Sequence, residues 1–301
     1  MDTSLPLARL RGASKRYGSR LALDGLDLSL HGGQLTSLLG ANGAGKSTAV
    51  NLLLGLLAAD AGEVQVLGQA PCSLAVRRQC GVMLQSASIP ERLRVGEMLA
   101  LVRSGYPQPL DLDECVAMAG LDGLLARRYG TLSGGQQRRL QFALAICGRP
   151  RLLFLDEPTT GLDIGARQAL WAAVRRMVGE GCAVLLTTHY LEEAEALSDR
   201  VAVIDGGRLL AEGSVEEIRA RVSLRRIRCI SRLPAAAVAC WPGVREVARE
   251  GEALRIVAEP AEPVVRRLLE ADPRLAGLEI HRAGLSDAFL ALTRAPAQEA
   301  A

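Results

Sequence analysis

Lysine and aromatic residues are scarce in this chain. Only two of its 36 basic residues are lysines, Lys15 and Lys46, and aromatic residues make up 3% of the 301 positions. The formal net charge is only +3. Surfaces that bind nucleic acids combine a strong positive potential with aromatic side chains on which bases stack. The composition therefore predicts that the chain has no nucleic-acid partner.

Long apolar runs are also absent. No stretch reaches the roughly 18 consecutive apolar residues of a membrane-spanning helix, and residues 1–6 lack the basic and then apolar pattern of a secretory signal. The seven cysteines form no C-x-x-C pair, which is typical of reduced thiols in the cytosol. We therefore expect a chain in the bacterial cytoplasm that does not cross a bilayer by itself.

The rest of the composition, 49% hydrophobic and 23% charged, is that of a globular protein with one large domain or two. Apolar runs alternate with helix-like periodicity, which predicts parallel βαβ units and an α/β fold. We expect residues 87–131 to be mostly helical, with a break at 106–109. The expected strands are 21–23, 26–30, 35–39, 151–155, 182–187 and 200–205, and the expected helices are 49–54, 95–102, 137–147, 166–179 and 191–198.

The pattern changes near residue 220. Four short segments then favour strands and three favour helices, in the order βαββαβ followed by a last helix, which is typical of a small ferredoxin-like domain. We therefore predict two domains, residues 1–220 and a C-terminal α+β accessory domain at 221–301. The strands are expected at 225–230, 245–249, 253–258 and 277–282, and the helices at 234–240, 262–270 and 285–293.

The segment Gly40–Thr48, with the sequence GANGAGKST, fits the phosphate-binding pattern G-x-x-x-x-G-K-[ST]. An apolar strand precedes it and a helix follows it, which is the context that this P-loop motif requires. The glycines allow successive backbone N–H groups to turn toward one anion, and the helix N-terminus adds positive potential. The chain places one of its two lysines at the motif's lysine position. These features predict a site for a nucleoside triphosphate.

Two acidic residues, Asp156 and Glu157, end an apolar run later in the chain. In P-loop enzymes an aspartate at this strand end holds Mg²⁺ together with the P-loop hydroxyl, here Ser47. Mg²⁺ binds few carboxylates and completes its shell with phosphate oxygens and water. Glu157 would then polarise an attacking water as a general base. The acids predict Mg²⁺-dependent hydrolysis of the triphosphate.

A second glycine motif, Leu132–Gln136 with the sequence LSGGQ, stands before an expected helix and offers another helix N-terminus to an anion. With this signature in place, residues 6 to about 217 resemble the nucleotide-binding subunit of ABC transporters. The remaining motifs follow in the family's order, with a Q-loop glutamine at Gln85, the D-loop at 161–163 and a switch histidine at His189. The resemblance implies a P-loop ABC cassette with a mixed sheet, an antiparallel β subdomain and a helical subdomain at about 87–140.

The resemblance also implies the role of each matched residue. Tyr17 would stack on adenine, Glu157 would be the base, and His189 and Gln85 would position the attacking water. Mg²⁺ would be held by Ser47, Gln85 and Asp156. The residues expected to contact ATP are Tyr17, Gly40, Asn42, Gly43, Ala44, Gly45, Lys46, Ser47, Thr48, Ser133, Gly134, Gly135, Gln136 and Asp163.

Other residues are expected to have no part in the chemistry. His31 and His281 are interpreted as structural, and Arg138 and Arg139 as part of a solvated helix face. For Tyr17, an ordinary core or surface position stays an alternative to adenine stacking.

In this family two cassettes dock head to tail, and each ATP lies between the P-loop of one and the signature of the other. The resemblance therefore implies a homodimer that ATP closes and hydrolysis reopens. Residues 190–213 and 285–293 are similar to the export subgroup. That similarity implies the ATPase subunit of an ABC-2-type exporter, at the cytoplasmic face of the cell membrane, with a separate permease docked on residues 87–131 and the Gln85 loop. Ala41 and Ile164 depart from the prolines usual at these positions.

Three other functions are weighed against this one. The subunit could serve an ABC importer, although importers often carry a different C-terminal domain. A soluble ABC ATPase of DNA repair or translation usually has long coiled coils or two cassettes, and neither occurs here. An ordinary P-loop kinase or GTPase would lack the LSGGQ signature, and a GTPase would also need an Asn-Lys-x-Asp motif, which this chain does not have.

Overall fold

The computed structural model describes residues 5–85, 88–220, 225–282 and 284–294. Contacts within the chain divide it into two compact units, Met1–Glu212 and Gly213–Ala301. The domain boundary expected at 220/221 adjoins residues 221–224, which lie outside the described residues. Within the described ranges no helix has the length and apolar character needed to cross a bilayer.

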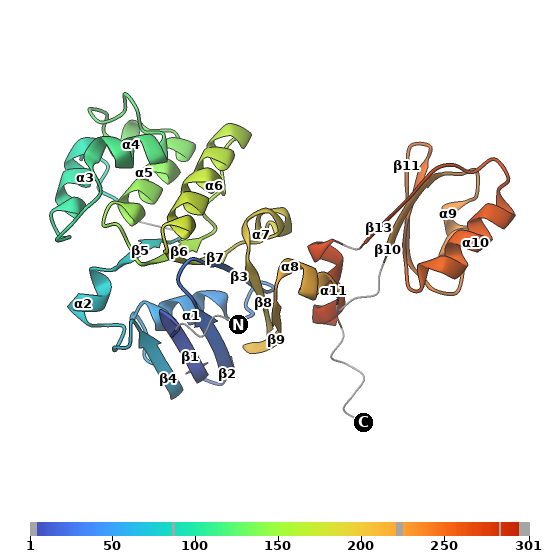
Figure 1. Cartoon of the computed structure of the whole chain (residues 1–301), viewed down its shortest axis with the longest axis horizontal. Coiled ribbons are helices and arrows are strands. Elements are labelled where there is room, and N and C mark those ends of the chain that lie inside the picture. The colour runs from blue at the N-terminus through green and yellow to red at the C-terminus, as the bar shows by residue number, and fades with distance from the viewer. Residues whose placement is uncertain (1–4, 86–87, 221–224, 283, 295–301) are drawn as a thin grey trace. The chain divides into compact units, whose positions relative to one another are not determined.

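The first unit contains a six-stranded sheet in the order β5-β6-β7-β3-β8-β9 (Figure 1). The neighbouring strands from β5 to β8 pair in parallel, so the predicted βαβ arrangement is confirmed. Strand β9 follows β8 after the two-residue turn 206–207 and was not predicted. The bounds are β3 (Leu35–Leu39), β5 (Cys80–Met83), β6 (Leu152–Asp156), β7 (Ala183–Thr187), β8 (Arg200–Asp205) and β9 (Arg208–Gly213).

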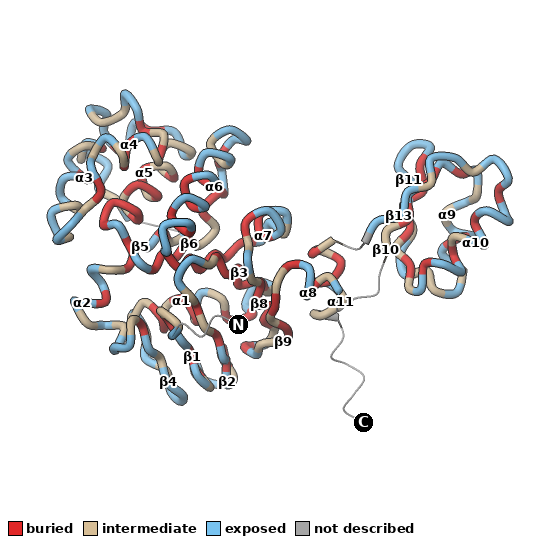
Figure 2. The backbone as a smooth tube through the Cα atoms, in the orientation of Figure 1, coloured by how far each residue is buried: buried red, intermediate tan, exposed pale blue. Residues whose placement is uncertain are grey.

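Strands β3, β6, β7 and β8 of this sheet are buried on both faces, which explains why they consist mostly of apolar residues (Figure 2). In β6, Leu153 and Leu155 join the core on one side, together with residues of α5 (Gly134–Ile146) and α6 (Ile164–Gly179). Leu152 and Phe154 alternate with them and join the core on the other side, with α1 (Lys46–Leu53). The sheet is therefore the middle layer of the unit.

A three-stranded antiparallel sheet in the order β2-β1-β4 packs into the same core as α1. Its strands are β1 (Ala8–Tyr17), β2 (Arg20–Leu30) and β4 (Ala61–Val66). The ranges predicted as strands, 21–23 and 26–30, both lie in β2, and only the expected break between them was wrong, because β2 continues through Gly25. Gly25 has a φ of 66° and lies where the pairing with β1 shifts register, a conformation that glycine adopts without steric cost.

The predicted helical region contains α3 (Val95–Arg103), α4 (Leu112–Ala119) and a 3₁₀ turn (Tyr129–Thr131) before α5. Irregular segments connect them, including the break predicted at 106–109, and residue 87 lies outside the described residues. The prediction that residues 87–131 are mostly helical was wrong, because less than half of the described residues in this range are helical. Short helices α2 (Leu74–Arg77) and α7 (Leu191–Leu197) complete the first unit.

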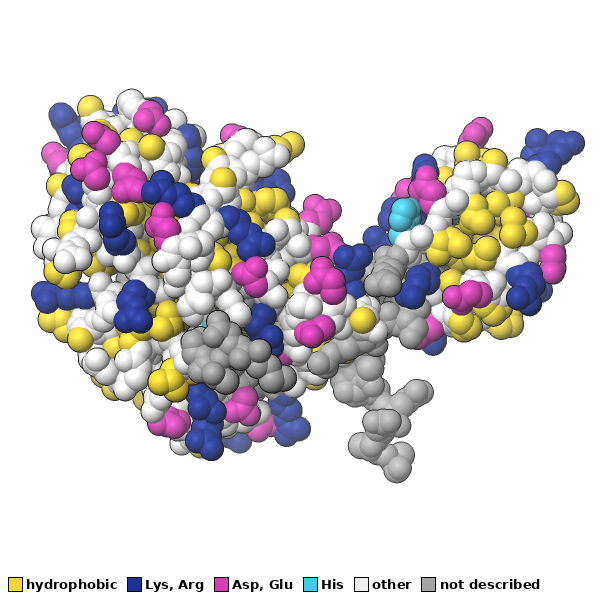
Figure 3. All heavy atoms as spheres, in the orientation of Figure 1, with side chains coloured by type: hydrophobic (Ala, Val, Ile, Leu, Met, Phe, Trp, Pro, Cys, Tyr) yellow, Lys and Arg dark blue, Asp and Glu magenta, His cyan; other side chains and the backbone are white. Residues whose placement is uncertain are grey.

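The second unit has the predicted βαββαβ order. Its four strands form an antiparallel sheet in the order β11-β12-β10-β13, so the two strands of each βαβ segment are separated by a third strand, as in a ferredoxin-like domain. Helix α11 contacts α8 within this unit. The bounds are α8 (Val215–Ala220), β10 (Arg225–Ile230), α9 (Ala235–Ala239), β11 (Val244–Glu250), β12 (Ala253–Ala258), α10 (Ala261–Ala271), β13 (Ala276–Arg282) and α11 (Leu285–Arg294). On the face shown in Figure 3, basic and acidic side chains are interspersed.

The two-sided burial of β6 gives a stability prediction. Phe154 is 1% exposed, and Phe154→Ala should lower the free energy of unfolding by about 3–5 kcal/mol, because it removes buried apolar area and leaves a cavity. Urea denaturation followed by circular dichroism measures this loss. Leu74→Ala is the control, since Leu74 is 63% exposed and should change stability by less than about 0.5 kcal/mol. Equal unfolding midpoints for the two variants would contradict the layered core.

Candidate nucleotide-binding site

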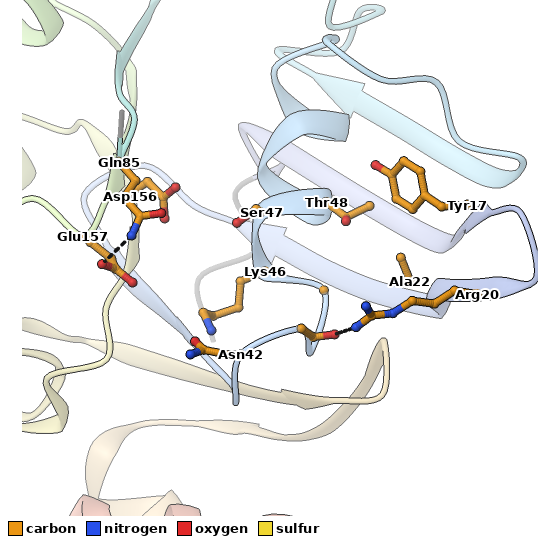
Figure 4. Close-up of a pocket in the computed structure, with 12 residues that line it drawn as sticks. Tyr17, Arg20, Ala22, Asn42, Lys46, Ser47, Thr48, Gln85, Asp156 and Glu157 are labelled. Atoms are coloured by element: carbon orange, nitrogen blue, oxygen red, sulfur yellow. Dashed lines mark hydrogen bonds between the residues drawn. The ribbon is translucent and has the colours of Figure 1, made fainter. Parts of the chain in front are cut away.

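A cleft of about 590 Å³ opens at the carboxyl ends of β3 and β6 (Figure 4). Crevices at this edge of parallel sheets are the usual ligand sites of α/β proteins. Ten of the predicted site residues meet here, although they come from distant parts of the chain. The lining residues are Tyr17, Arg20, Ala22, Asn42, Gly43, Gly45, Lys46, Ser47, Thr48, Gln85, Asp156 and Glu157.

The glycines of the P-loop are required by its packing. Gly45 precedes α1 with a φ of 109°, and a Cβ there would lie 2.6 Å from the carbonyl oxygen of Ala22 in β2. A Cβ on Gly40 would lie 2.6 Å from the carbonyl oxygen of Ile204 in β8. Real side chains do not approach that closely, so only glycine permits the loop to pass between these strands. Gly40 itself does not line the cleft.

Lys46 presents its ammonium group at the mouth of the P-loop. Its Nζ donates hydrogen bonds to the carbonyl oxygens of Gly40 at 2.7 Å and Ala41 at 3.1 Å. Burial lowers the pKa of Lys46, and the nearby charges of Glu157 and Asp156 oppose that shift. Lys46 lines the cleft, so its ammonium group is available to a phosphate bound there.

The two acids at the end of β6 have different partners. Asp156 accepts a hydrogen bond from the hydroxyl of Thr187 in β7. The Glu157 carboxylate accepts a hydrogen bond from Gln85 Nε2 at 3.1 Å and lies 3.3 Å from Nδ1 of His189. The three predicted catalytic residues are therefore in contact, with the Gln85 and His189 side chains both against the Glu157 carboxylate.

The residues predicted to hold Mg²⁺ offer a hydroxyl, a carboxylate and a side-chain amide, all oxygen ligands of the kind that Mg²⁺ prefers. In the described part of the chain no cluster of three or more His, Cys, Asp or Glu residues could hold a metal ion. A magnesium ion at Ser47 and Asp156 would thus depend on phosphate oxygens and water for the rest of its shell.

The signature residues Ser133 to Gln136 do not line the cleft. Helix α5 begins at Gly134, three residues earlier than predicted. Ser133 accepts a hydrogen bond from the Gln136 N–H at 3.3 Å, while the Gln136 side chain accepts one from the Ser133 N–H at 3.0 Å. This capping box stabilises the first turn despite its glycines.

The remaining predicted site residues also have structural roles. Asp163 caps α6 by accepting a hydrogen bond from the Ala166 N–H at 2.8 Å. The Ala44 side chain is buried and its N–H donates to the carbonyl oxygen of Ala41, so this residue does not line the cleft. Tyr17 is 48% exposed at the cleft wall, where an aromatic ring is available for stacking.

Sequence reasoning missed four residues of this region. Arg20 and Ala22 line the cleft, and Arg20 donates to the Gly43 carbonyl oxygen at 3.2 Å. Thr187 donates a hydrogen bond to Asp156. The expectation that Arg138 belongs to a solvated face was wrong, because the residue is only 9% exposed. A signal was available, since Arg138 shares its helical face with buried Phe142 and Ala145, four and seven residues later.

The fold and the cleft define a P-loop nucleotide-binding protein. Comparisons with known proteins show to which family of this class the chain belongs. Residues 23–160 match the family model described as ABC transporter. The daunorubicin resistance ATP-binding protein DrrA3 of Streptomyces coeruleorubidus is 39% identical, over 94% of this chain and 94% of that protein. The Nod factor export ATP-binding protein I of Ralstonia nicotianae is 36% identical, over 96% of this chain and 94% of that protein.

Solved structures show the same fold. An ATP-binding subunit of an ABC transporter has a TM-score of 0.66 at 27% identity, covering 71% of this chain and 92% of its own. The ADP conformation of another ABC transporter cassette has a TM-score of 0.61 at 25% identity, covering 71% and 93%. This chain therefore belongs to the ABC transporter family, as an ATP-binding subunit with ATPase activity.

The two lysines give a matched test of the P-loop. Lys46→Ala should abolish measurable binding of a fluorescent ATP analogue, because the half-buried cation expected to bind the phosphates is lost. Lys15→Ala should bind the analogue normally, since Lys15 does not line the cleft and pairs with Asp60 at 2.7 Å. Equal affinity in a titration of the two variants would contradict the assignment of the cleft.

Proposed function

We propose that this chain is the ATPase subunit of an ABC-2-type membrane exporter. One observation carries the proposal: the similarity to the drug-resistance and Nod factor export proteins covers 94–96% of the chain and so includes both units. The cassette alone would suit an importer as well. Because the relatives also match the C-terminal residues, the exporter is favoured over the importer and over a soluble ABC ATPase.

Within the cleft, the proposed reaction is hydrolysis of ATP to ADP and phosphate. Glu157 accepts a proton from water while the water oxygen attacks the γ-phosphorus and the bond to ADP breaks. Gln85 and His189 both contact the Glu157 carboxylate and would orient the water. Ser47 and Asp156 would hold Mg²⁺, whose charge stabilises the triphosphate and the leaving group.

We also propose a head-to-tail homodimer. Ser133, Gly134 and Gly135 form an N-terminus of a 13-residue helix outside the cleft of their own chain. An anion is stabilised at such a helix N-terminus. In the proposed dimer this anion is the triphosphate bound in the cleft of the second copy of the chain. Asp163 and Gly161 belong to the same region, because a Cβ on Gly135 would lie 3.5 Å from the Gly161 carbonyl oxygen.

A separate permease is the proposed membrane partner, bound at the cytoplasmic face. An apolar groove of about 450 Å³ supports this contact. It begins next to the Gln85 loop at Val82, which is 36% exposed, and continues along Val102 and Tyr106 of the helical region at about 87–140. An apolar helical segment of a permease fits such a groove. The predicted domains, residues 1–220 and 221–301, would then be the ATP-hydrolysing cassette and an accessory domain.

The general-base proposal predicts the behaviour of Glu157→Gln. The amide has the same shape but cannot accept the proton, so kcat for ATP should fall by about 10²-fold or more. MgATP should then hold the variant as a dimer, measured by light scattering after gel filtration. Normal turnover in this variant would exclude Glu157 as the base.

The dimer proposal predicts that Ser133→Asp, made in the Glu157→Gln background, prevents the ATP-dependent dimer. Aspartate still caps the helix, but like charges facing each other in an interface cost several kcal/mol. Ser73→Asp is the matched control, because Ser73 caps α2 in the same way at 3.2 Å from the Val76 N–H. A dimer that forms equally with both variants would refute the shared site.

A further inference from the structure

One turn into α5, the Arg138 side chain points into the protein. The residue is 9% exposed, and its burial lowers the pKa of the guanidinium group while the charges of Asp156 and Glu157 raise it. Burying a charge is costly unless hydrogen bonds replace those to water. Arg138 therefore needs hydrogen bonds within the protein that offset the cost of burying its charge.

The hydrogen bonds of Arg138 connect two main-chain segments beside the cleft, 84–85 and 156–157. Nη1 of Arg138 donates to the carbonyl oxygens of Leu84 and Gln85, both at 3.1 Å, and to Oε1 of Gln141 at 2.8 Å. Nη2 donates to the carbonyl oxygen of Asp156 at 3.4 Å and to that of Glu157. A planar guanidinium fork reaches both main chains at once, which a lysine ammonium cannot do.

The main chain of Glu157 is fixed from two sides. Its φ of 49° is a left-handed conformation, which is unfavourable for a residue other than glycine. The Glu157 N–H donates to the Thr187 carbonyl oxygen at 2.9 Å, and its own carbonyl accepts from Arg138. These two bonds stabilise the conformation that directs the carboxylate to Gln85.

We infer that Arg138 is a positioning residue for ATP hydrolysis, which holds the main chains of Gln85 and Glu157 so that their side chains meet around the attacking water. The inference rests on the proposed role of Glu157 as the base. Arg138 does not line the cleft in which ATP is expected to bind. Its loss should therefore slow the chemical step without weakening ATP binding.

The test compares Arg138→Lys with Arg139→Lys in the full chain. Lysine keeps the charge but loses the fork, so kcat should fall about tenfold for Arg138→Lys while KM for MgATP changes by less than about twofold. Arg139 is the next residue on the same helix and donates to the Gly120 carbonyl oxygen. Its lysine variant should keep the wild-type kcat.

A second measurement separates positioning from folding. In the Glu157→Gln background, Arg138→Lys should still form the ATP-dependent dimer, because the binding surfaces are intact. Unchanged kcat in Arg138→Lys, a parallel rise in KM, or loss of this dimer would overturn the inference. If Glu157→Gln loses turnover while Arg138→Lys does not, only the inference fails. If Glu157→Gln turns over normally, the proposed base fails and the inference fails with it.

Discussion

The P-loop passes between β2 and β8 with no room for a side chain on its inner surface, and the rest of the site depends on this constraint. A Cβ on either Gly40 or Gly45 would lie 2.6 Å from a strand carbonyl oxygen. The loop is therefore held against the sheet, and Lys46 and the start of α1 have a fixed relation to the strand ends. Asp156 and Glu157 stand at one of those ends. The geometry of the sheet therefore fixes the positions of Lys46 and of the two acids before any nucleotide binds.

Strands β3, β6, β7 and β8 of the central sheet could be predicted because they are buried on both faces, whereas the edge strands β5 and β9, which are partly exposed, were not predicted. Continuous apolar runs such as Leu152–Leu155 carry a strong signal that survives without knowledge of the neighbours. Strands β1 and β4 could not be predicted in the same way. Their residues alternate between buried and exposed or are mostly exposed, and their structure is defined by pairing with each other. The start of α5 was placed too late, because helix propensity counts against Gly134 and Gly135, whereas the Ser133 capping box outweighs it.

The same distinction applies to the site. Lys46, Asp156 and Glu157 could be predicted because each stands in a motif whose chemistry is local in sequence. Thr187 and Arg138 act through hydrogen bonds to groups 31 and 18 or more residues away, and no short pattern reveals such a contact. The burial of Arg138 was the accessible clue, since it lies on the apolar face of its helix. An arginine on such a face is a candidate for binding main-chain carbonyls.

Arginine serves this purpose repeatedly in the chain. Arg103 donates two hydrogen bonds to the Leu110 carbonyl oxygen, and Arg249 donates two to that of Ser231. A flat fork with five N–H groups suits such carbonyls at the ends of elements. The P-loop imposes a different requirement, because one atom must bind the loop carbonyls of Gly40 and Ala41 and still offer a donor to a phosphate. The tetrahedral ammonium group of Lys46 has that geometry and the guanidinium does not, which gives a physical reason for a lysine at this position in a chain otherwise rich in arginine.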